Sequence, residues 1–222
     1  HNGFELDKYF KTDDLKKCSR FSIILFKTIL SKLYHWKIYV VGSVEYQYPN
    51  HLFQAGYFLD KKYYDENTID FKHLLLSEKN QSLLKDIQNS NSVGVHIRRG
   101  DYMTKQNLVI FGNICTQKYY HDAIRIITEK VNDAVFYVFS DDISWVQTHL
   151  DIPNAVYVNW NTGESSIYDM YLMSSCKYNI IANSTFSYWA ARLNKKTNMV
   201  IYPSKWYNTF TPDIFPESWC GI

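Results

Sequence analysis

The sequence has little of what would mark a disulfide-rich, metal-binding or nucleic-acid-binding protein. Its four cysteines lie far apart among 222 residues and form no CxxC pair, so neither a zinc site nor a disulfide scaffold is indicated. The net charge is only +2, without the basic excess of nucleic-acid-binding domains. Any attraction for anions must therefore come from a few well-placed Arg and Lys residues.

The sequence also lacks a hydrophobic run of membrane-spanning length. The most apolar window, residues 21–30, is interrupted by Lys27 and is shorter than the roughly 20 residues that a transmembrane helix needs. No signal peptide is visible, and we expect a cytoplasmic protein of bacterial type, with at most peripheral association with the inner membrane. Asn80 and Asn183 begin sequons that would suit a secreted or Golgi enzyme, but we interpret both as chance matches.

What the chain does contain is a repeated β-α pattern. Hydrophobic residues make up 46% of it, enough to bury the core of one large domain or two small ones. From residue 93 onward, short β-branched runs alternate with amphipathic stretches, as in parallel sheets. The pattern predicts strands at 93–97, 134–139, 155–158, 178–181 and 199–202, and helices at 117–130, 142–150, 164–175 and 185–194. We therefore predict a doubly wound, Rossmann-like α/β domain.

The pattern before residue 92 is less regular. It predicts a helix at 14–35, a strand at 37–41, and helical stretches at 69–76 and 79–88. The polar run at 89–92 favours turns, so we place a domain boundary there. The expected organisation is a partial N-terminal domain over residues 1–91 and a C-terminal Rossmann-like domain over residues 92–222.

The sharpest motif is His-Ile-Arg-Arg-Gly-Asp-Tyr at 96–102, directly after a predicted strand. Ligands of open α/β sheets bind beyond the carboxyl ends of strands. Arginine suits a diphosphate there because its planar fork donates two parallel hydrogen bonds and keeps its charge. Strand alternation puts His96 and Arg98 on one face and Arg99 on the other. The alternative interpretation is a surface pair of arginines bridged to Asp101.

Two further predicted strands end in polar residues at the same edge. Asp141 follows one of them, where Ser140 or Asp141 could cap the next helix and a carboxylate could orient a neighbouring group. The sequence has no Asp-x-Asp, the pattern with which many nucleotide-sugar enzymes bind a metal ion. Residues 183–185 lie where another strand meets a helix, an arrangement that binds phosphate or simply caps the helix. Three such strand ends together predict a nucleotide site.

These segments resemble the α-1,2-fucosyltransferases of glycosyltransferase family 11. The resemblance covers most of the chain and rests on HxRRGDY at 96–102, FSDD at 139–142, CKYNIIANSTFSYWAARL at 176–193, and YPSKWYN at 202–208. Two departures stand out. The family's glycine-rich GGLGNQ segment is missing, so we expect the first strand and loop of the N-terminal domain to fall outside this chain. The family's Phe-Ser-Trp-Trp is Phe-Ser-Tyr-Trp at 186–189.

The resemblance implies a GT-B fold with two Rossmann-like domains, the N-terminal one incomplete in this chain. It implies a galactoside 2-α-L-fucosyltransferase that moves L-fucose from GDP-β-L-fucose to a galactose-containing glycan with inversion, using no metal and no other cofactor. Two alternatives remain open. One is a GT-B enzyme with another nucleotide sugar or fucosyl linkage, and the other is a sugar- or nucleotide-binding module without turnover.

The resemblance also assigns roles to residues. It places Arg98 on the β-phosphate, with His96 and Asp169 near guanine. The other predicted donor-binding residues are Arg99, Asp141, Asn183, Ser184, Thr185, Phe186 and Ser187. Asp169 makes independent chemical sense, because a carboxylate can accept two hydrogen bonds from the guanine edge. Asp101 is our candidate for the base that deprotonates the acceptor hydroxyl.

Overall fold

The computed structural model describes residues 6–11, 39–42, 53–56 and 69–222. These residues belong to two compact units: residues 6–10, 69–211 and 216–222 lie in the first, and residues 11, 39–42, 53–56 and 212–215 lie in the second. In the second unit, β1 (Tyr39–Gly42) pairs in parallel with β2 (Phe53–Gly56). β1 overlaps the strand predicted at 37–41, whereas the helix predicted at 14–35 lies outside the described residues.

The first unit is built on a six-stranded sheet in which every neighbouring pair is parallel and the order is β5-β4-β3-β6-β7-β8. Its strands are β3 (Asn91–Ile97), β4 (Ala134–Ser140), β5 (Ala155–Val158), β6 (Tyr178–Ile180), β7 (Met199–Tyr202) and β8 (Cys220–Gly221). The five predicted strands are confirmed to within two residues. The sequence analysis missed β8, because two residues are too few to show an alternating pattern.

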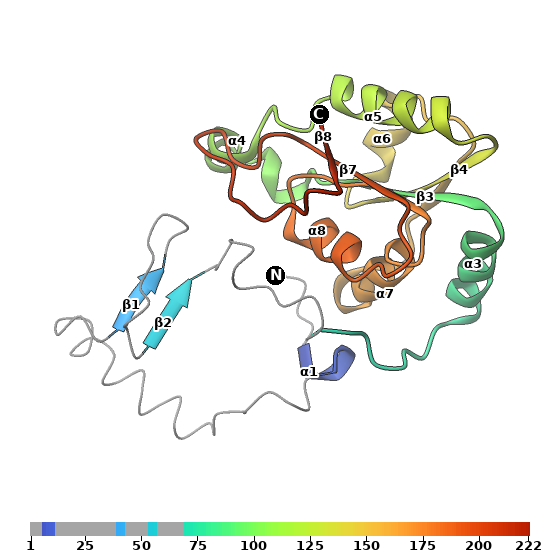
Figure 1. Cartoon of the computed structure of the whole chain (residues 1–222), viewed down its shortest axis with the longest axis horizontal. Helices are drawn as coiled ribbons and strands as arrows, with labels where there is room; N and C mark the ends of the chain where they lie inside the picture. Colours follow the sequence, from blue (N-terminus) through green and yellow to red (C-terminus); the bar gives the residue numbers. More distant parts are fainter. Residues whose placement is uncertain (1–5, 12–38, 43–52, 57–68) are drawn as a thin grey trace. The chain divides into compact units, whose positions relative to one another are not determined.

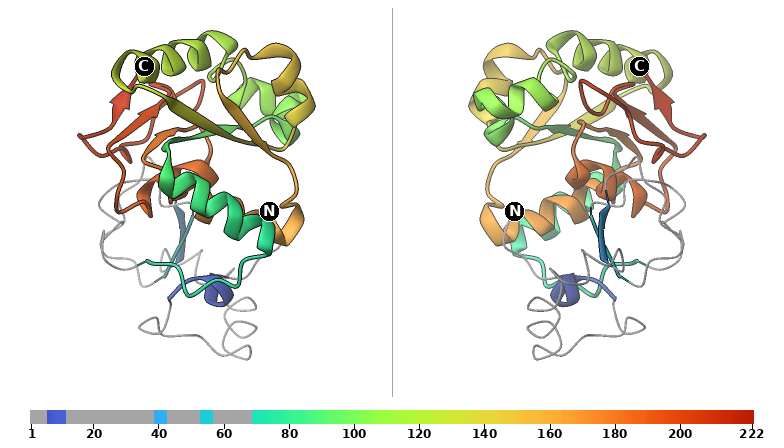
Figure 2. Two further views of the ribbon diagram at one scale, coloured as in Figure 1. Left: turned by 90° about the vertical axis from the view of Figure 1, so that its right-hand side faces the viewer. Right: turned by 90° about the vertical axis from the view of Figure 1, so that its left-hand side faces the viewer.

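Helices cover both faces of this sheet (Figures 1 and 2). One face carries α5 (Gln117–Lys130) and α6 (Ile143–His149), and the other carries α3 (Glu78–Asn89), α7 (Ser166–Met173) and α8 (Thr185–Arg192). These helices confirm the predicted ones: α5 has the predicted bounds, α3 is longer by one residue at each end, and the other three are shorter by one or two residues at one or both ends. The short α1 (Leu6–Tyr9) also contributes, since Tyr9 is buried with the α7 side of the sheet. α3 therefore shares a compact unit with the sheet, although the expected boundary at 89–92 would separate them.

One prediction about local structure is wrong, and three short elements were not predicted. The stretch at 69–76 is not helical: Phe71 forms an antiparallel bridge with Phe10, and the Lys72 N–H donates to the Tyr9 carbonyl at 2.8 Å. A contact with a distant segment thus replaces the local helical bonds. The structure also contains α4 (Lys105–Phe111) and two 3₁₀ turns, η2 (Gly100–Met103) and η3 (Gly163–Ser165), which the sequence analysis missed.

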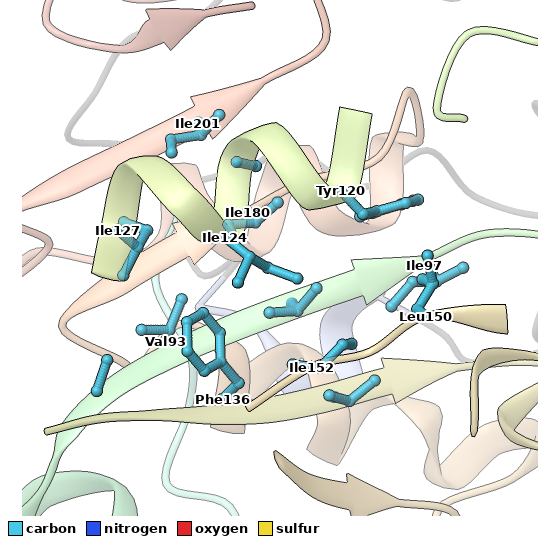
Figure 3. Packing of buried hydrophobic residues seen from close by; sticks show 14 of the residues in the cluster. Val93, Ile97, Tyr120, Ile124, Ile127, Phe136, Leu150, Ile152, Ile180 and Ile201 are labelled. Carbon is cyan, nitrogen blue, oxygen red and sulfur yellow. The ribbon is translucent and has the colours of Figure 1, made fainter. Parts of the chain in front are cut away.

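Strand alternation sorts the core into two layers. Val93 and Ile97 of β3 pack with Phe136 of β4 beneath Ile124 and Ile127 of α5 (Figure 3). On the opposite face, the buried residues come from β4 together with α3, α7 and α8. Burial on both faces explains why the strands read as near-continuous apolar runs.

Gly94 is the only glycine of β3, and a side chain added there would collide with the buried side-chain amide of Asn179. A Cβ there would lie 2.9 Å from Asn179 Nδ2 and 3.3 Å from Cys176 Sγ. That amide donates to the Met173 carbonyl at 3.0 Å and its oxygen accepts from Asn194 at 3.0 Å, so the group cannot easily move.

We therefore expect Gly94→Ala to lower the free energy of unfolding by about 1–3 kcal/mol through overpacking. Urea unfolding followed by circular dichroism measures the change. Thr128→Ala, on the exposed side of α5, serves as the control and should stay within about 0.5 kcal/mol of the parent. Equal changes in the free energy of unfolding for the two substitutions would show that the packing around Asn179 accommodates a methyl group.

Candidate functional site

The order of the strands in the sheet reverses direction between β3 and β6, which makes this position the topological switch point of the sheet. These strands are neighbours, yet the segment after β3 leads to α5 on one face and the segment after β6 leads to α8 on the other. Diverging connections of this kind open the crevice in which α/β proteins bind ligands. Contacts join the two strand ends: the Tyr102 hydroxyl donates to the Asn183 carbonyl at 2.9 Å, and the His96 and Phe186 rings lie 5.2 Å apart.

Arg98, directly after β3, is bound by two carboxylates. Its Nη1 donates to Asp141 Oδ2 and its Nη2 donates to Asp101 Oδ1, each at 2.6 Å. The backbone N–H of Arg99 donates to the other Asp141 oxygen at 2.9 Å. Asp141 therefore orients Arg98. Orienting a neighbouring group was one of the two roles predicted for this carboxylate, and capping the next helix was the other. The alternative interpretation, in which Asp101 bridges the two arginines, holds for Arg98 alone, since Arg99 pairs with Asp142.

Arg99 points to different partners, in agreement with strand alternation. Its Nε donates to Asp142 Oδ2 at 3.1 Å, and its guanidinium lies 3.7 Å from the centre of the Trp145 ring. Asp142 also caps α6, because its Oδ1 accepts from the Trp145 N–H at 3.1 Å. The cap expected at Ser140 or Asp141 is thus one residue later in the structure, which leaves Asp141 available for Arg98.

His96 is a buried base without a hydrogen-bond partner on one nitrogen. Its side chain is only 6% exposed, and Nδ1 has no partner in the described part of the chain. Burial, helped by the charge of Arg98, lowers the pKa of His96 to about 3, so the imidazole is neutral at physiological pH. Buried polar atoms are normally paired, and an unpaired one beside a strand end indicates a place for a ligand group.

The first turn of α8 faces the same switch point. Ser184 is its N-cap residue but makes no side-chain cap hydrogen bond, so the first N–H groups of the helix are left without a cap. Thr185 is exposed and Phe186 is partly exposed, whereas the Ser187 hydroxyl is buried and donates to the Ala182 and Ser184 carbonyls at 3.3 Å. Uncapped N–H groups at a helix start are an anion-binding arrangement.

Asn183 has a structural task that the sequence analysis missed. Its Nδ2 donates to the Trp206 carbonyl at 3.1 Å and to the Phe111 carbonyl at 3.3 Å, and the side chain is 2% exposed. It therefore ties α4 and the C-terminal loop to the end of β6. This burial, and the 1% exposure of Asn80, agree with the interpretation of both sequons as chance matches.

Asp169 belongs to a network of amides that joins three elements. Its Oδ1 accepts from Asn161 Nδ2 at 2.7 Å, in the loop after β5. Asn161 and the buried Asn80 of α3 bond to each other reciprocally, at 3.0 and 3.1 Å, and the Trp160 indole donates to Asn80 at 2.7 Å. The sequence analysis missed Trp160, Asn161 and Asn80. The signal available for the first two was their place after a predicted strand, at the polar edge of the sheet.

Burial raises the pKa of the Asp169 carboxyl to about 7, although the hydrogen bond from Asn161 acts in the opposite direction. Asp169 therefore changes its charge close to neutral pH. A carboxyl that exchanges its proton in this range is typical of binding and catalytic sites.

The described residues show no group of three or more His, Cys, Asp or Glu side chains arranged to hold a metal ion. Within residues 6–11, 39–42, 53–56 and 69–222, no helix is both long enough and apolar enough to cross a bilayer. The cofactor requirement and the cellular location of the protein stay predictions.

The sheet order and the polar groups at its switch point define a doubly wound α/β protein with a candidate site for an anionic ligand. The chain belongs to glycosyltransferase family 11, whose model, Glycosyl transferase family 11, matches residues 6–222. The family predicted from the motifs is thus confirmed.

Named relatives include bacterial and mammalian enzymes. The chain is 32% identical to an alpha-1,2-colitosyltransferase of Escherichia coli, over 100% of this chain and 84% of that protein. It is 44% identical to the O-antigen biosynthesis glycosyltransferase WbnK of Escherichia coli, over 54% of this chain and 40% of that protein. It is 28% identical to a galactoside alpha-(1,2)-fucosyltransferase 2 of Pongo pygmaeus, over 68% of this chain and 48% of that protein.

Solved structures similar to this chain include fucosyltransferase NodZ from Bradyrhizobium, with a TM-score of 0.44 and 16% identity, over 84% of this chain and 62% of that one.

Asp169→Asn is expected to change how stability depends on pH. The folded protein holds the Asp169 proton up to about pH 7, whereas the ordinary carboxyl value is 3.8. Its contribution to stability is therefore complete below about pH 4 and is lost as the pH rises through about 7. Asparagine does not titrate, so the variant should lack this loss. Urea unfolding of both proteins across this pH range measures the difference, and parallel curves would mean that Asp169 titrates as an ordinary carboxyl.

Proposed function

We propose that the chain transfers L-fucose from GDP-β-L-fucose to a galactoside hydroxyl, with inversion and with formation of an α-1,2 linkage. The observation that carries this proposal is the Arg98 guanidinium at the end of β3, next to the strand β6 that leads into the uncapped start of α8. Family membership and the names of the relatives support the sugar and the linkage. We also propose the two-domain GT-B organisation, with the compact unit that carries the six-stranded sheet on the donor side.

The diphosphate of the donor fits the charged end of the site. Arg98 offers a planar fork to the β-phosphate, and the first N–H groups of α8 add fixed partial positive charge. As the acceptor hydroxyl attacks C1, the bond from C1 to the phosphate oxygen breaks and its electron pair leaves with GDP. Fixed donors stabilise that charge best when they are already in place before the reaction, which is how the site would work without a metal.

The guanine base fits the end of the site that carries little charge. The neutral His96 has an unpaired buried Nδ1 that a nucleotide atom could satisfy. In its ionised form, which dominates above about pH 7, the Asp169 carboxylate can accept two hydrogen bonds from the adjacent N–H groups of guanine, and adenine presents no such pair. Asn161 holds this carboxylate by one oxygen, which fixes its direction. These features support selection of guanine over adenine.

Asp101 is the proposed base for the acceptor hydroxyl. Its side chain is 59% exposed and lies beside Arg98, so an acceptor arriving from solvent could reach it near the leaving phosphate. The hydroxyl proton would pass to this carboxylate as the new bond to C1 forms.

The decisive test is incubation with GDP-fucose and a panel of β-galactosides in excess EDTA, followed by linkage analysis of the product. We expect an α-1,2-fucosylated galactoside at a rate that EDTA does not change, because fixed donors replace the metal. Fucosylation at another position would reject the linkage. A loss of activity that Mg²⁺ or Mn²⁺ restores would reject metal independence.

A second donor deserves direct comparison because the match to the α-1,2-colitosyltransferase extends over the whole chain. Colitose is the 3-deoxy form of fucose, so the two donors share the same GDP and differ by one hydroxyl. A site that hydrogen-bonds the 3-hydroxyl should prefer fucose strongly, because removing a recognised hydroxyl leaves a buried partner unpaired. The ratio of kcat/KM for GDP-fucose and GDP-colitose decides which sugar the protein uses.

Arg98→Lys is expected to lower kcat by about a hundred- to a thousandfold, the usual cost of removing a preorganised donor to a developing negative charge. Lysine keeps the charge but replaces two parallel hydrogen bonds with one, and the loss should fall on kcat more than on KM for the donor. Arg99→Lys is the matched control and should be milder, since Arg99 contacts Asp142 and Trp145. Steady-state kinetics on folded variants checks this, and a near-normal kcat for Arg98→Lys would remove it from the reaction.

A further inference from the structure

Arg98 has both of its amino groups occupied in the structure. Nη1 contacts Asp141 and Nη2 contacts Asp101, each at 2.6 Å. Each amino group keeps one further N–H, but a diphosphate bound to this guanidinium would bring its negative charge beside both carboxylates, and that repulsion favours the displacement of one of them. The structure indicates which one, because the two carboxylates are held very differently.

Asp141 is the firmly held partner. Its side chain is 28% exposed, and its second oxygen accepts from the Arg99 backbone N–H at 2.9 Å. Gly100 contributes by lacking a side chain: a Cβ there would overlap Asp141 Oδ2 and lie 3.2 Å from its Cγ. Asp141 thus sits against the Gly100 backbone, where alanine would push it away from Arg98.

Asp101 is the loosely held partner. Its side chain is 59% exposed, and only one of its carboxylate oxygens accepts from Arg98. The backbone beneath it is fixed, because the Asp101 carbonyl accepts from Asn107 Nδ2 at 2.9 Å and from the Thr104 N–H at 3.2 Å. The carboxylate can therefore swing away from Arg98 without any change in the backbone.

We propose that the two carboxylates divide their roles: Asp141, seated against Gly100, is a positioning residue that holds Arg98 throughout, whereas Asp101 is exchanged for the donor diphosphate. This inference rests on the proposed function. The Asp101 oxygen that accepts from Arg98 is occupied by that hydrogen bond, and displacement by the diphosphate makes it available to another donor. Donor binding would thus free Asp101 to take the acceptor proton only when a sugar is present to be transferred.

The test is the affinity of four single variants for GDP and for inorganic pyrophosphate, measured by titration calorimetry. Asp101→Asn should bind both ligands roughly two- to fivefold more tightly, since the competing carboxylate of a partly exposed ion pair is gone, while kcat falls. Asp141→Asn should bind both more weakly, because Arg98 loses its support. Gly100→Ala should also bind more weakly, since its Cβ displaces Asp141.

Asp142→Asn is the matched control. It removes an adjacent carboxylate that contacts Arg99 and not Arg98, so its affinities should stay close to those of the parent chain. The critical result is that Asp101→Asn raises the affinity whereas Asp141→Asn lowers it. Removing a negative charge near an anion site would by itself tighten binding in both variants, and a general structural role would weaken it in both.

Changes of the same sign at Asp101 and Asp141 would overturn the proposal. Parent-like binding by Gly100→Ala would also overturn it. If Asp141→Asn does not fold, Asp101→Asn alone decides, since weaker binding there contradicts displacement. A parent chain that binds neither GDP nor pyrophosphate would refute the proposed function and this inference together. If the parent chain binds GDP but Asp101→Asn and Asp141→Asn change the affinity in the same direction, only this inference is refuted.

Discussion

The ion pair between Arg98 and Asp141 is the interaction on which the candidate site depends. It joins the carboxyl end of β3 to that of β4, and the N–H of Arg99 adds a second bond to the same carboxylate. Side chains at strand ends are free to take many directions, because the sheet no longer constrains them. Linking two neighbouring strand ends through one carboxylate limits the directions that the guanidinium can take. The order of the strands then decides that Arg98 lies at the switch point.

Periodicity predicted the central sheet and α5, the longest helix among the described residues, because both patterns are long enough to distinguish. The predicted helix at 117–130 coincides with α5, whose apolar stripe includes Ile124 and Ile127. Periodicity failed where the local structure depends on contacts with residues far away in the sequence. The stretch at 69–76 looks helical by itself, yet Phe71 is bound to Phe10. The short β8 and α4 carry too few residues for a pattern to emerge.

The residue types of the site could be predicted, but their pairing could not. Asp141 and Asp142 are adjacent in sequence and chemically identical, and yet one holds Arg98 and the other holds Arg99 and caps α6. Only the exact direction of the backbone at the end of β4 separates them. The network of Asn80, Asn161 and Asp169 was beyond reach for a similar reason, since its members come from α3, a loop and α7 and no local pattern links them.

Charge is distributed unevenly over the residues predicted to hold the nucleotide, and burial explains the difference. Arg98 and its carboxylates are partly exposed and form close ion pairs. His96 and Asp169 are largely buried, and burial moves the pKa of His96 down to about 3 and that of Asp169 up to about 7. Both shifts favour the neutral form, because a low-dielectric interior penalises charge of either sign. A ligand with a charged diphosphate and a neutral base carries the same gradient along its own length. The diphosphate of such a ligand would contact the charged Arg98. Its neutral base would contact His96 and Asp169, whose charged forms are disfavoured by burial.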